Sequence, residues 1–126
     1  PKQLISYDIY TSGNIENVYI AAKEIDVDFK FIEANVLTVN IEETDLLFID
    51  TLHQYKQLKQ ELEMHSKNVR KYIIMHDTTK FGTSDELTGA PNGLQPALEE
   101  FLSDNDSWEI EIEYTNNNGL TILKRI

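Results

Sequence analysis

The sequence predicts a single α/β domain over residues 1–126, with a mostly parallel sheet, helices on both faces and an antiparallel hairpin at its C-terminal end. Short apolar runs typical of strands alternate with segments whose apolar residues recur every three or four positions, as on one side of a helix. Residues 46–49 and 72–75 are continuously apolar, which is typical of parallel strands covered on both faces. A length of 126 residues suits one domain.

The first third of the chain is expected to form a β-α-β unit. Residues 4–9 read as a strand and are followed by turn residues over 11–14. Ser12 or Asn14 can cap the helix that follows. The apolar stripe of that helix recurs at helical spacing and comprises Ile15, Val18, Tyr19, Ala22 and Ile25. Residues 29–34 form the second expected strand.

The middle of the chain repeats this pattern. The two apolar runs at residues 46–49 and 72–75 flank a helix marked by Tyr55, Leu58 and Leu62. Residues 81–91 contain two glycines and a proline, and we expect them to form a mobile loop that closes over a ligand.

The C-terminal third combines a helix with a hairpin. The helix opens with Asn92 and Gln95 at capping-box spacing. Its stripe comprises Leu94, Ala97, Leu98, Phe101 and Leu102. Residues 108–114 and 120–124 then flank an Asn-rich turn ending in Gly119, which predicts an antiparallel hairpin.

Composition excludes several function classes. The formal net charge is −11 and the basic residues are scattered, so we expect no nucleic-acid partner. The absence of cysteine excludes disulfides, zinc-thiolate sites and thiol nucleophiles, and it fits a reducing, cytoplasmic location. No apolar run approaches the ~18 residues of a membrane helix, so no membrane partner is expected.

Polar side chains follow each of the four expected parallel strands. They are Asp8, Glu33 with Asn35, Asp50, and His76 with Asp77. The carboxyl ends of parallel strands meet at one edge of a sheet, which is where ligands of such sheets bind. We therefore predict a functional site at this edge, although turns and helix caps also favour Asp and Asn.

Asp50, His53, His76 and Asp77 are the candidates for metal binding and catalysis. Carboxylates at Asp50 and Asp77 suit Mg²⁺, whereas an imidazole at His53 or His76 would favour a transition metal. Either histidine can equally act as a general base beside Asp50. Two structural alternatives remain open, because His53 can cap the following helix and His76 can be an ordinary strand-end residue.

Four stretches carry more specific patterns. They are Phe48-Ile49-Asp50 followed by His53 and Tyr55, His76-Asp77-Thr78, Gly93-Leu94 at a helix start, and Asn116 to Leu120. Together they resemble the class I S-adenosylmethionine-dependent methyltransferases, and most closely the cephalosporin hydroxylase-like and macrocin O-methyltransferase-like branch. The resemblance covers nearly the whole chain and implies a Rossmann-like fold with S-adenosylmethionine as cofactor.

The resemblance also implies roles for individual residues. Asp8 matches the acid that holds the cofactor ribose, and Asn35 and Val36 fall where the family contacts adenine. Asp50 and Asp77 match positions that carry Mg²⁺ in metal-dependent members. His76 stands where a further acid is common, and Asp50, His53 and His76 are the candidate catalytic residues.

One part of the family pattern has no counterpart here. The family's domains begin with a strand, a glycine-bearing loop and a helix that cradle the methionine part of the cofactor, and nothing before Pro1 supplies them. That strand lies in mid-sheet in the family. We expect an upstream segment or a second copy of the chain to fill the gap, or a sheet that closes differently, and we expect residues 1–126 alone to bind the cofactor weakly.

The predicted function is O-methylation of a small molecule or sugar, with metal assistance. An accessory domain that has lost cofactor binding is the alternative, and a different metal-dependent enzyme on the same scaffold is a third possibility.

Overall fold

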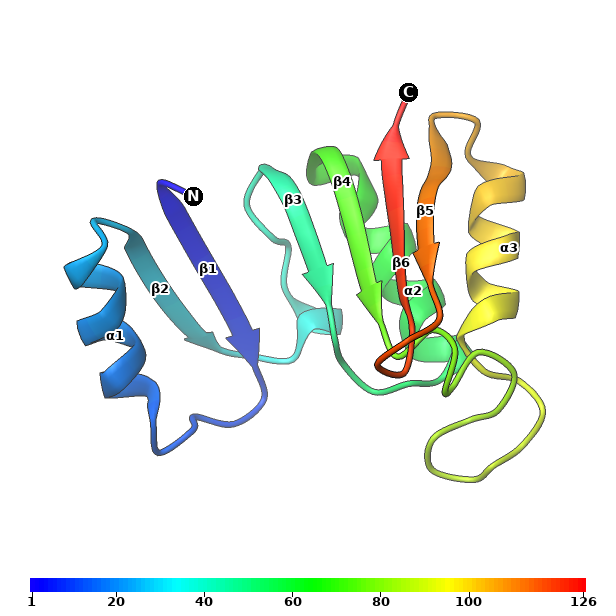
Figure 1. Cartoon of the computed structure of the whole chain (residues 1–126), viewed down its shortest axis with the longest axis horizontal. Helices are drawn as coiled ribbons and strands as arrows, with labels where there is room; N and C mark the ends of the chain where they lie inside the picture. The colour runs from blue at the N-terminus through cyan, green and yellow to red at the C-terminus, as the bar shows by residue number, and fades with distance from the viewer. The chain divides into compact units, whose positions relative to one another are not determined.

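The computed structural model describes all residues of the chain, Pro1–Ile126. The polypeptide folds into two compact units, Pro1–Asn40 and Ile41–Ile126, and each is described by itself (Figure 1). No helix in either unit is both long and apolar enough to cross a bilayer.

The first unit is the expected β-α-β element. Strand β1 (Gln3–Asp8) and strand β2 (Asp28–Glu33) pair in parallel, with Asp8 opposite Glu33, and helix α1 (Ile15–Glu24) connects them. The ring of Tyr19 on α1 meets that of Phe29 edge-on at 4.9 Å between centroids, which fixes the helix against β2. Asn14 stands at the N-cap of α1, but no side chain caps this end.

The second unit contains a four-stranded sheet in the order β3-β4-β6-β5. Its elements are β3 (Thr44–Ile49), α2 (Tyr55–His65), β4 (Val69–His76), α3 (Leu94–Asp104), β5 (Trp108–Tyr114) and β6 (Leu120–Arg125). The chain also contains two short 3₁₀ turns, Val36–Thr38 in the first unit and Ser66–Asn68 between α2 and β4.

The prediction of a mostly parallel sheet is wrong, because the sheet of the second unit is mixed. Strands β3 and β4 are parallel, whereas β6 runs antiparallel to both β4 and β5. The expected hairpin of β5 and β6 does form. Its second strand, β6, lies beside β4 and thereby connects the hairpin to the parallel pair of β3 and β4. Thr121 and Leu123 on β6 are buried, and three glutamates on β5 favour an edge position, which explains this order.

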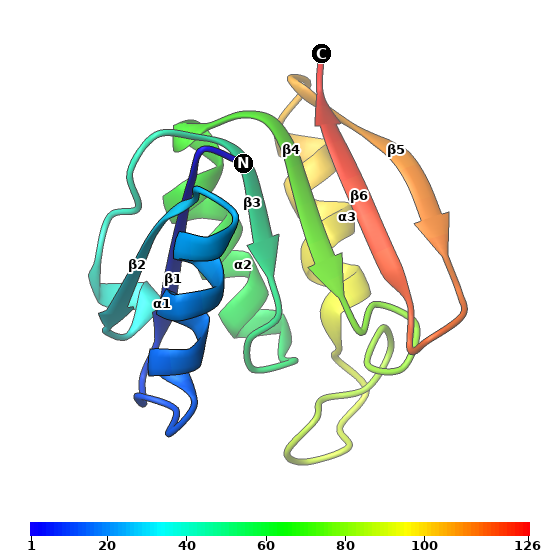
Figure 2. The same cartoon turned by 60° about the vertical axis from the view of Figure 1, so that its left-hand side comes forward.

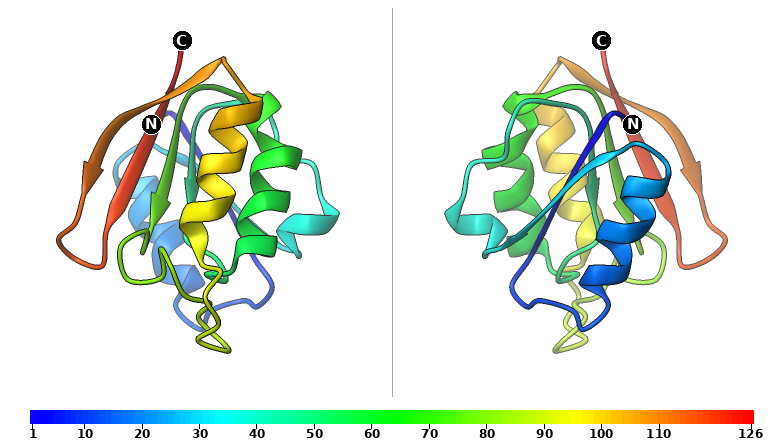
Figure 3. Two further views of the ribbon diagram at one scale, coloured as in Figure 1. Left: turned by 90° about the vertical axis from the view of Figure 1, so that its right-hand side faces the viewer. Right: turned by 90° about the vertical axis from the view of Figure 1, so that its left-hand side faces the viewer.

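Both helices of the second unit lie on one face of its sheet. Figure 2 shows α2 and α3 behind the strands, and the left view of Figure 3 shows them side by side. The core between helices and strands consists of apolar side chains that are at most 6% exposed: Ile49, Leu58, Leu62, Ile73, Met75, Ala97, Leu98, Phe101 and Leu123. The sequence predicted helices on both faces of the sheet, but within this unit both helices lie on the same face.

The opposite face and the β3 edge of this sheet are apolar and open within the unit. Leu46 and Phe48 are 46% and 53% exposed, and Phe48 stands in register with Ile74 and Ile122 across the sheet. β3 has no strand partner on its outer side. β5, the other edge strand, carries alternating glutamates of the kind that protect exposed edges.

Candidate functional site

The parallel pairing of β3 and β4 brings four predicted site residues to one edge. Ile49 lies opposite Met75, so Asp50 directly after β3 and His76 and Asp77 at the end of β4 emerge at the same level. His53 follows three residues after Asp50, in the loop that leads into α2. We name these four side chains, Asp50, His53, His76 and Asp77, the strand-end cluster.

His53 lies at the centre of the strand-end cluster. Its Nε2 atom is 3.3 Å from Oδ1 of Asp50 and 3.4 Å from Oδ2 of Asp77. The metal-binding atoms of Asp50, His53 and Asp77 all lie within 4.8 Å of one another. Asp50 and Asp77 thus meet across the ends of neighbouring strands, as the sequence predicted, and the side chain between them is His53.

Glu86 in the loop after β4 holds the other side of the imidazole. Its Oε2 accepts hydrogen bonds from Nδ1 of His53 at 2.8 Å and from the backbone N–H of His53 at 3.1 Å. These two bonds hold the pKa of Glu86 below its usual value. A neutral His53 therefore carries its proton on Nδ1 and presents the lone pair of Nε2 to the two aspartates.

Phe81 covers the flat side of His53. The two rings stack with centroids 4.8 Å apart and an interplanar angle of 17°. Only 12% of the His53 side chain is exposed. The residue is therefore fixed by a carboxylate at one edge and an aromatic ring on one face.

Asp77 combines burial with an uncommon backbone conformation. Its φ angle is 60°, in the left-handed region that non-glycine residues avoid at a cost of roughly 1–3 kcal/mol. Its Oδ1 atom and the Nε2 atom of His53 are both buried and lack a hydrogen-bond partner. Unpartnered buried polar atoms are costly, and a water molecule, an ion or a ligand can supply the missing interaction.

His76 belongs to the same group but is more open to solvent. Its Nδ1 atom lies 3.3 Å from Oδ1 of Asp77 and 3.7 Å from Oδ1 of Asp50. Its side chain is 22% exposed, and that of Asp50 is 45% exposed. These two residues therefore form the accessible side of the strand-end cluster, whereas His53 and Asp77 form its buried side.

Two residues of the site were missed from the sequence, Glu61 and Glu86. Glu61 is 2% exposed on α2 and accepts a hydrogen bond from Thr51 Oγ1 at 2.8 Å and another from Gln57. Burial raises its pKa. The position of Glu61 beside Leu58 and Leu62, on the apolar side of the expected helix, indicates that its carboxyl group is buried. No local pattern points to Glu86.

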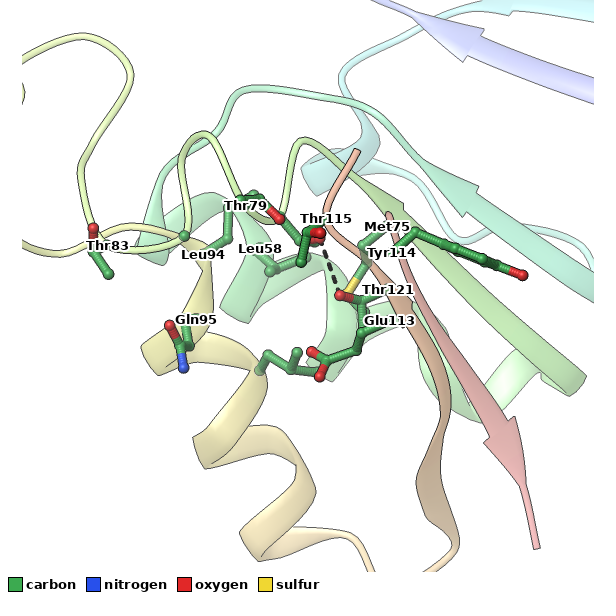
Figure 4. A pocket seen from close by; sticks show the side chains of 13 residues that line it. Leu58, Met75, Thr79, Thr83, Leu94, Gln95, Glu113, Tyr114, Thr115 and Thr121 are labelled. Atoms are coloured by element: carbon green, nitrogen blue, oxygen red, sulfur yellow. Dashed lines mark hydrogen bonds between the residues drawn. The ribbon is translucent and has the colours of Figure 1, made fainter. Parts of the chain in front are cut away.

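A cavity of about 240 Å³ lies beside the turn that follows Asp77 (Figure 4). Leu58, Met75 and Leu94 line its apolar part, and Gln95 and Glu113 supply polar groups. Thr121 donates a hydrogen bond to Thr78 at its wall, the dashed line in Figure 4. The cavity opens between α3 and the end of β5, where the sequence predicted no site.

The residues predicted to bind the cofactor gather in the first unit, at the carboxyl ends of β1 and β2. The Asp8 carbonyl accepts a hydrogen bond from the N–H of Ala34, and the exposed Asp8 carboxylate accepts one from the N–H of Tyr10. Asn35 Oδ1 caps the turn that begins at Val36 by accepting from the N–H of Leu37. The Asp8 carboxylate can therefore accept ribose hydroxyls, whereas the Asn35 oxygen is already engaged.

No family model and no curated protein matches the sequence. Solved structures do match the fold. A Corynebacterium glutamicum protein from a structural genomics programme superposes with a TM-score of 0.69 at 16% identity. The superposition covers 98% of this chain and 60% of the Corynebacterium chain. Magnesium protoporphyrin IX methyltransferase from Synechocystis, solved with bound SAH, gives a TM-score of 0.59 at 13% identity and coverages of 97% and 63%.

A ribosomal protein methylase from Lactobacillus delbrueckii gives a TM-score of 0.56 at 14% identity, with coverages of 98% and 58%. The chain thus spans 58% to 63% of the length of these three structures. At such identities the likeness concerns the fold alone. The fold of this chain is methyltransferase-like, similar to that of the S-adenosylmethionine-dependent methyltransferases.

Proposed function

We propose that this chain forms the larger part of an S-adenosylmethionine-dependent methyltransferase that acts on a hydroxyl group of a small molecule or sugar. The observation that carries the proposal is the strand-end cluster, because two histidines and two aspartates converge where α/β sheets bind their ligands. The methyltransferase-like fold supports it. The motifs around Asp50 and His76 favour the macrocin O-methyltransferase-like branch.

The acceptor hydroxyl must lose its proton as its oxygen gains the methyl group. His76 is the more exposed of the two histidines, so its imidazole is the candidate general base. Asp77, 3.3 Å away, stabilises the imidazolium that forms. Asp50, the more exposed aspartate, can orient the acceptor hydroxyl by accepting a hydrogen bond from it.

The bound cofactor supplies a methyl group carried on a sulfonium, so an O–C bond forms as an S–C bond breaks. In the first unit, the exposed Asp8 carboxylate is the group suited to the ribose hydroxyls. Val36 offers an apolar side chain for the adenine. The residues present therefore fit the ribose and adenine parts of the cofactor.

The test is methyl transfer from labelled S-adenosylmethionine to a panel of phenols, sugars and other alcohols, using protein from the complete reading frame. We expect His76→Asn to lower kcat at least ~10²-fold, as general bases contribute 10²–10⁴. We expect Asp8→Asn to weaken cofactor binding about tenfold while leaving kcat nearly unchanged, because one charge-assisted hydrogen bond is lost.

Glu109→Gln on the exposed edge strand β5 serves as the matched control, and it should behave as the wild type. Unchanged kcat in His76→Asn would contradict the assigned base. Absence of both cofactor binding and methyl transfer in the complete protein would favour the alternative, an accessory domain that keeps the fold without catalysis.

A further inference from the structure

We infer that Asp50, His53 and Asp77 bind one divalent transition-metal ion. This site differs from the Mg²⁺ site expected over Asp50, His76 and Asp77, both in its histidine and in its metal. The inference goes beyond the proposed function, which assigns no metal to these residues. Metal binding can also be measured without the cofactor or the acceptor.

The spacing of the donor atoms fits one shared ion. His53 Nε2 lies 3.3 Å from an Asp50 oxygen and 3.4 Å from an Asp77 oxygen. Two ligand atoms that each bind an ion at about 2.1 Å lie about 3.0 to 3.4 Å apart in octahedral or tetrahedral geometry. Both pairs that include His53 therefore have the separation of two ligands of one ion, and the three donor atoms all lie within 4.8 Å of one another, so a small movement of an aspartate side chain completes the set.

The site also holds buried polar atoms without a hydrogen bond, although His76 Nδ1 lies 3.3 Å from Oδ1 of Asp77 and the oxygen of Asp77 nearest to His53 is Oδ2. Asp77 is 9% exposed, and its Oδ1 is buried without a hydrogen-bond partner. His53 Nε2 is likewise buried and unpartnered. A cation would satisfy both atoms, and two carboxylates with a neutral imidazole balance the charge of a divalent ion.

Glu86 prepares His53 for this role. Its carboxylate lies 2.8 Å from Nδ1, so the proton of an imidazole that binds a metal through Nε2 has an acceptor on the other side of the ring. Such carboxylate–histidine pairs orient metal ligands and raise their basicity. The stacked Phe81 ring further restricts rotation of the imidazole. His53 is thus held in one orientation that faces Asp50 and Asp77.

The donor set determines the class of metal. An imidazole nitrogen suits Mn²⁺, Fe²⁺, Co²⁺ or Zn²⁺ better than Mg²⁺, which prefers oxygen donors. The affinity of a site with nitrogen and oxygen ligands rises along the divalent series from Mn²⁺ through Co²⁺ to a maximum at Cu²⁺. Zn²⁺ binds more weakly than Cu²⁺ but more tightly than Mn²⁺. Asp50 is half exposed, so solvent or substrate can reach the remaining coordination positions.

The experiment is titration of the chain with Mn²⁺, Co²⁺, Zn²⁺ and Mg²⁺ by calorimetry, with the visible absorption of Co²⁺ as a readout of nitrogen ligation. We expect Mg²⁺ to bind at least tenfold more weakly than Mn²⁺, and Zn²⁺ to bind more tightly than Mn²⁺. His53→Asn should weaken Co²⁺ binding at least 100-fold and change the absorption bands. Glu86→Gln, which leaves all three ligands in place, should weaken binding ten- to 100-fold.

His76→Asn distinguishes the two ligand sets, because His76 lies beside Asp77 but outside the proposed set. It should weaken binding less than His53→Asn does. Asp50→Asn, at a half-exposed position, gives a second ligand variant if His53→Asn does not fold, as judged by circular dichroism. Equal affinity for Mg²⁺ and Mn²⁺ would overturn the inference. So would loss of binding in His76→Asn, unchanged binding in Glu86→Gln or Asp50→Asn, or no binding at millimolar metal. Failure of methyl transfer alone would leave it standing.

Discussion

Glu61 shows how one buried carboxyl group can position a site that it does not enter. Thr51 lies between Asp50 and His53 and donates a hydrogen bond to Glu61 on α2. Gln57, one turn earlier on the same helix, donates to the same oxygen. The loop that carries Asp50 and His53 is thereby attached to the rigid helix below it, so Glu61 acts as a positioning residue.

The raised pKa of Glu61 gives a prediction at the residue scale. Burial disfavours the ionised form of Glu61 and raises its pKa above the usual 4.5. The ionised carboxylate therefore lowers the free energy of unfolding at pH values above the pKa of the folded state, and this cost disappears as the pH falls towards 4.5 and below. Glu61→Gln keeps an oxygen for both donors and removes the charge. We expect the variant to be more stable than the wild type at pH 7, with the difference vanishing towards pH 4.5.

Urea unfolding at several pH values, followed by circular dichroism, measures this difference. Thr51→Val, which removes the hydroxyl donor and keeps the Glu61 charge, provides the control and should be less stable than the wild type. A constant difference between Glu61→Gln and the wild type from pH 4.5 to 7 would contradict the assignment.

At the scale of elements, the loop between β4 and α3 is anchored at both of its ends. The carbonyls of Phe81 and Gly82 accept hydrogen bonds from the N–H groups of Leu94 and Gln95, which opens α3 without a side-chain cap. The capping box expected from Asn92 and Gln95 is therefore absent, because backbone carbonyls satisfy the first turn instead. The predicted mobility of residues 81–91 stays a prediction.

Gly93 is the residue that permits this close junction. A Cβ atom at this position would lie 2.0 Å from the carbonyl oxygen of Phe81 and 2.7 Å from the Ser84 nitrogen. Backbone atoms cannot yield as a flexible side chain would. We expect Gly93→Ala to destabilise the second unit by about 3 kcal/mol, at the upper end of overpacking costs.

Denaturant unfolding followed by far-ultraviolet circular dichroism tests this expectation. Gly13→Ala is the control, because a Cβ atom there would meet nothing within 4 Å. Equal midpoints for Gly93→Ala and the wild type would show that the loop can move aside at little cost.

For the whole molecule, the affinity of residues 1–126 for the cofactor is a separate prediction. The Asp8 carboxylate can hold a ribose, and the resemblance implies that the methionine part of the cofactor needs a further strand, turn and helix N-terminus. If that segment lies outside residues 1–126, several charge-assisted hydrogen bonds, worth roughly 1.5–3 kcal/mol each, are lost. We expect residues 1–126 alone to bind S-adenosylmethionine weakly or not at all.

Isothermal titration of residues 1–126 with S-adenosylmethionine measures this affinity, and sedimentation gives the oligomeric state in the same buffer. Micromolar binding by a monomer would show that the cofactor pocket is complete. A protein from the complete reading frame that binds at least ~100-fold more tightly would agree with the prediction.

The sequence by itself determined the elements and the edge at which the strand-end cluster lies. Periodicity is a local property, so the β-α-β order, the parallel run from β3 to β4 and the C-terminal hairpin could be predicted from it. The convergence of Asp50 and Asp77 followed as well, because neighbouring parallel strands end at the same level.

Only the tertiary structure decided the order of the strands and the partners within the site. The position of β6 between β4 and β5 depends on which faces are buried against α2 and α3, a long-range property. His53 turns towards both aspartates because Glu86, 33 positions along the chain, accepts its Nδ1 proton and Phe81 stacks on its ring. Side-chain direction at a strand end depends on such distant contacts, and no local pattern contains them.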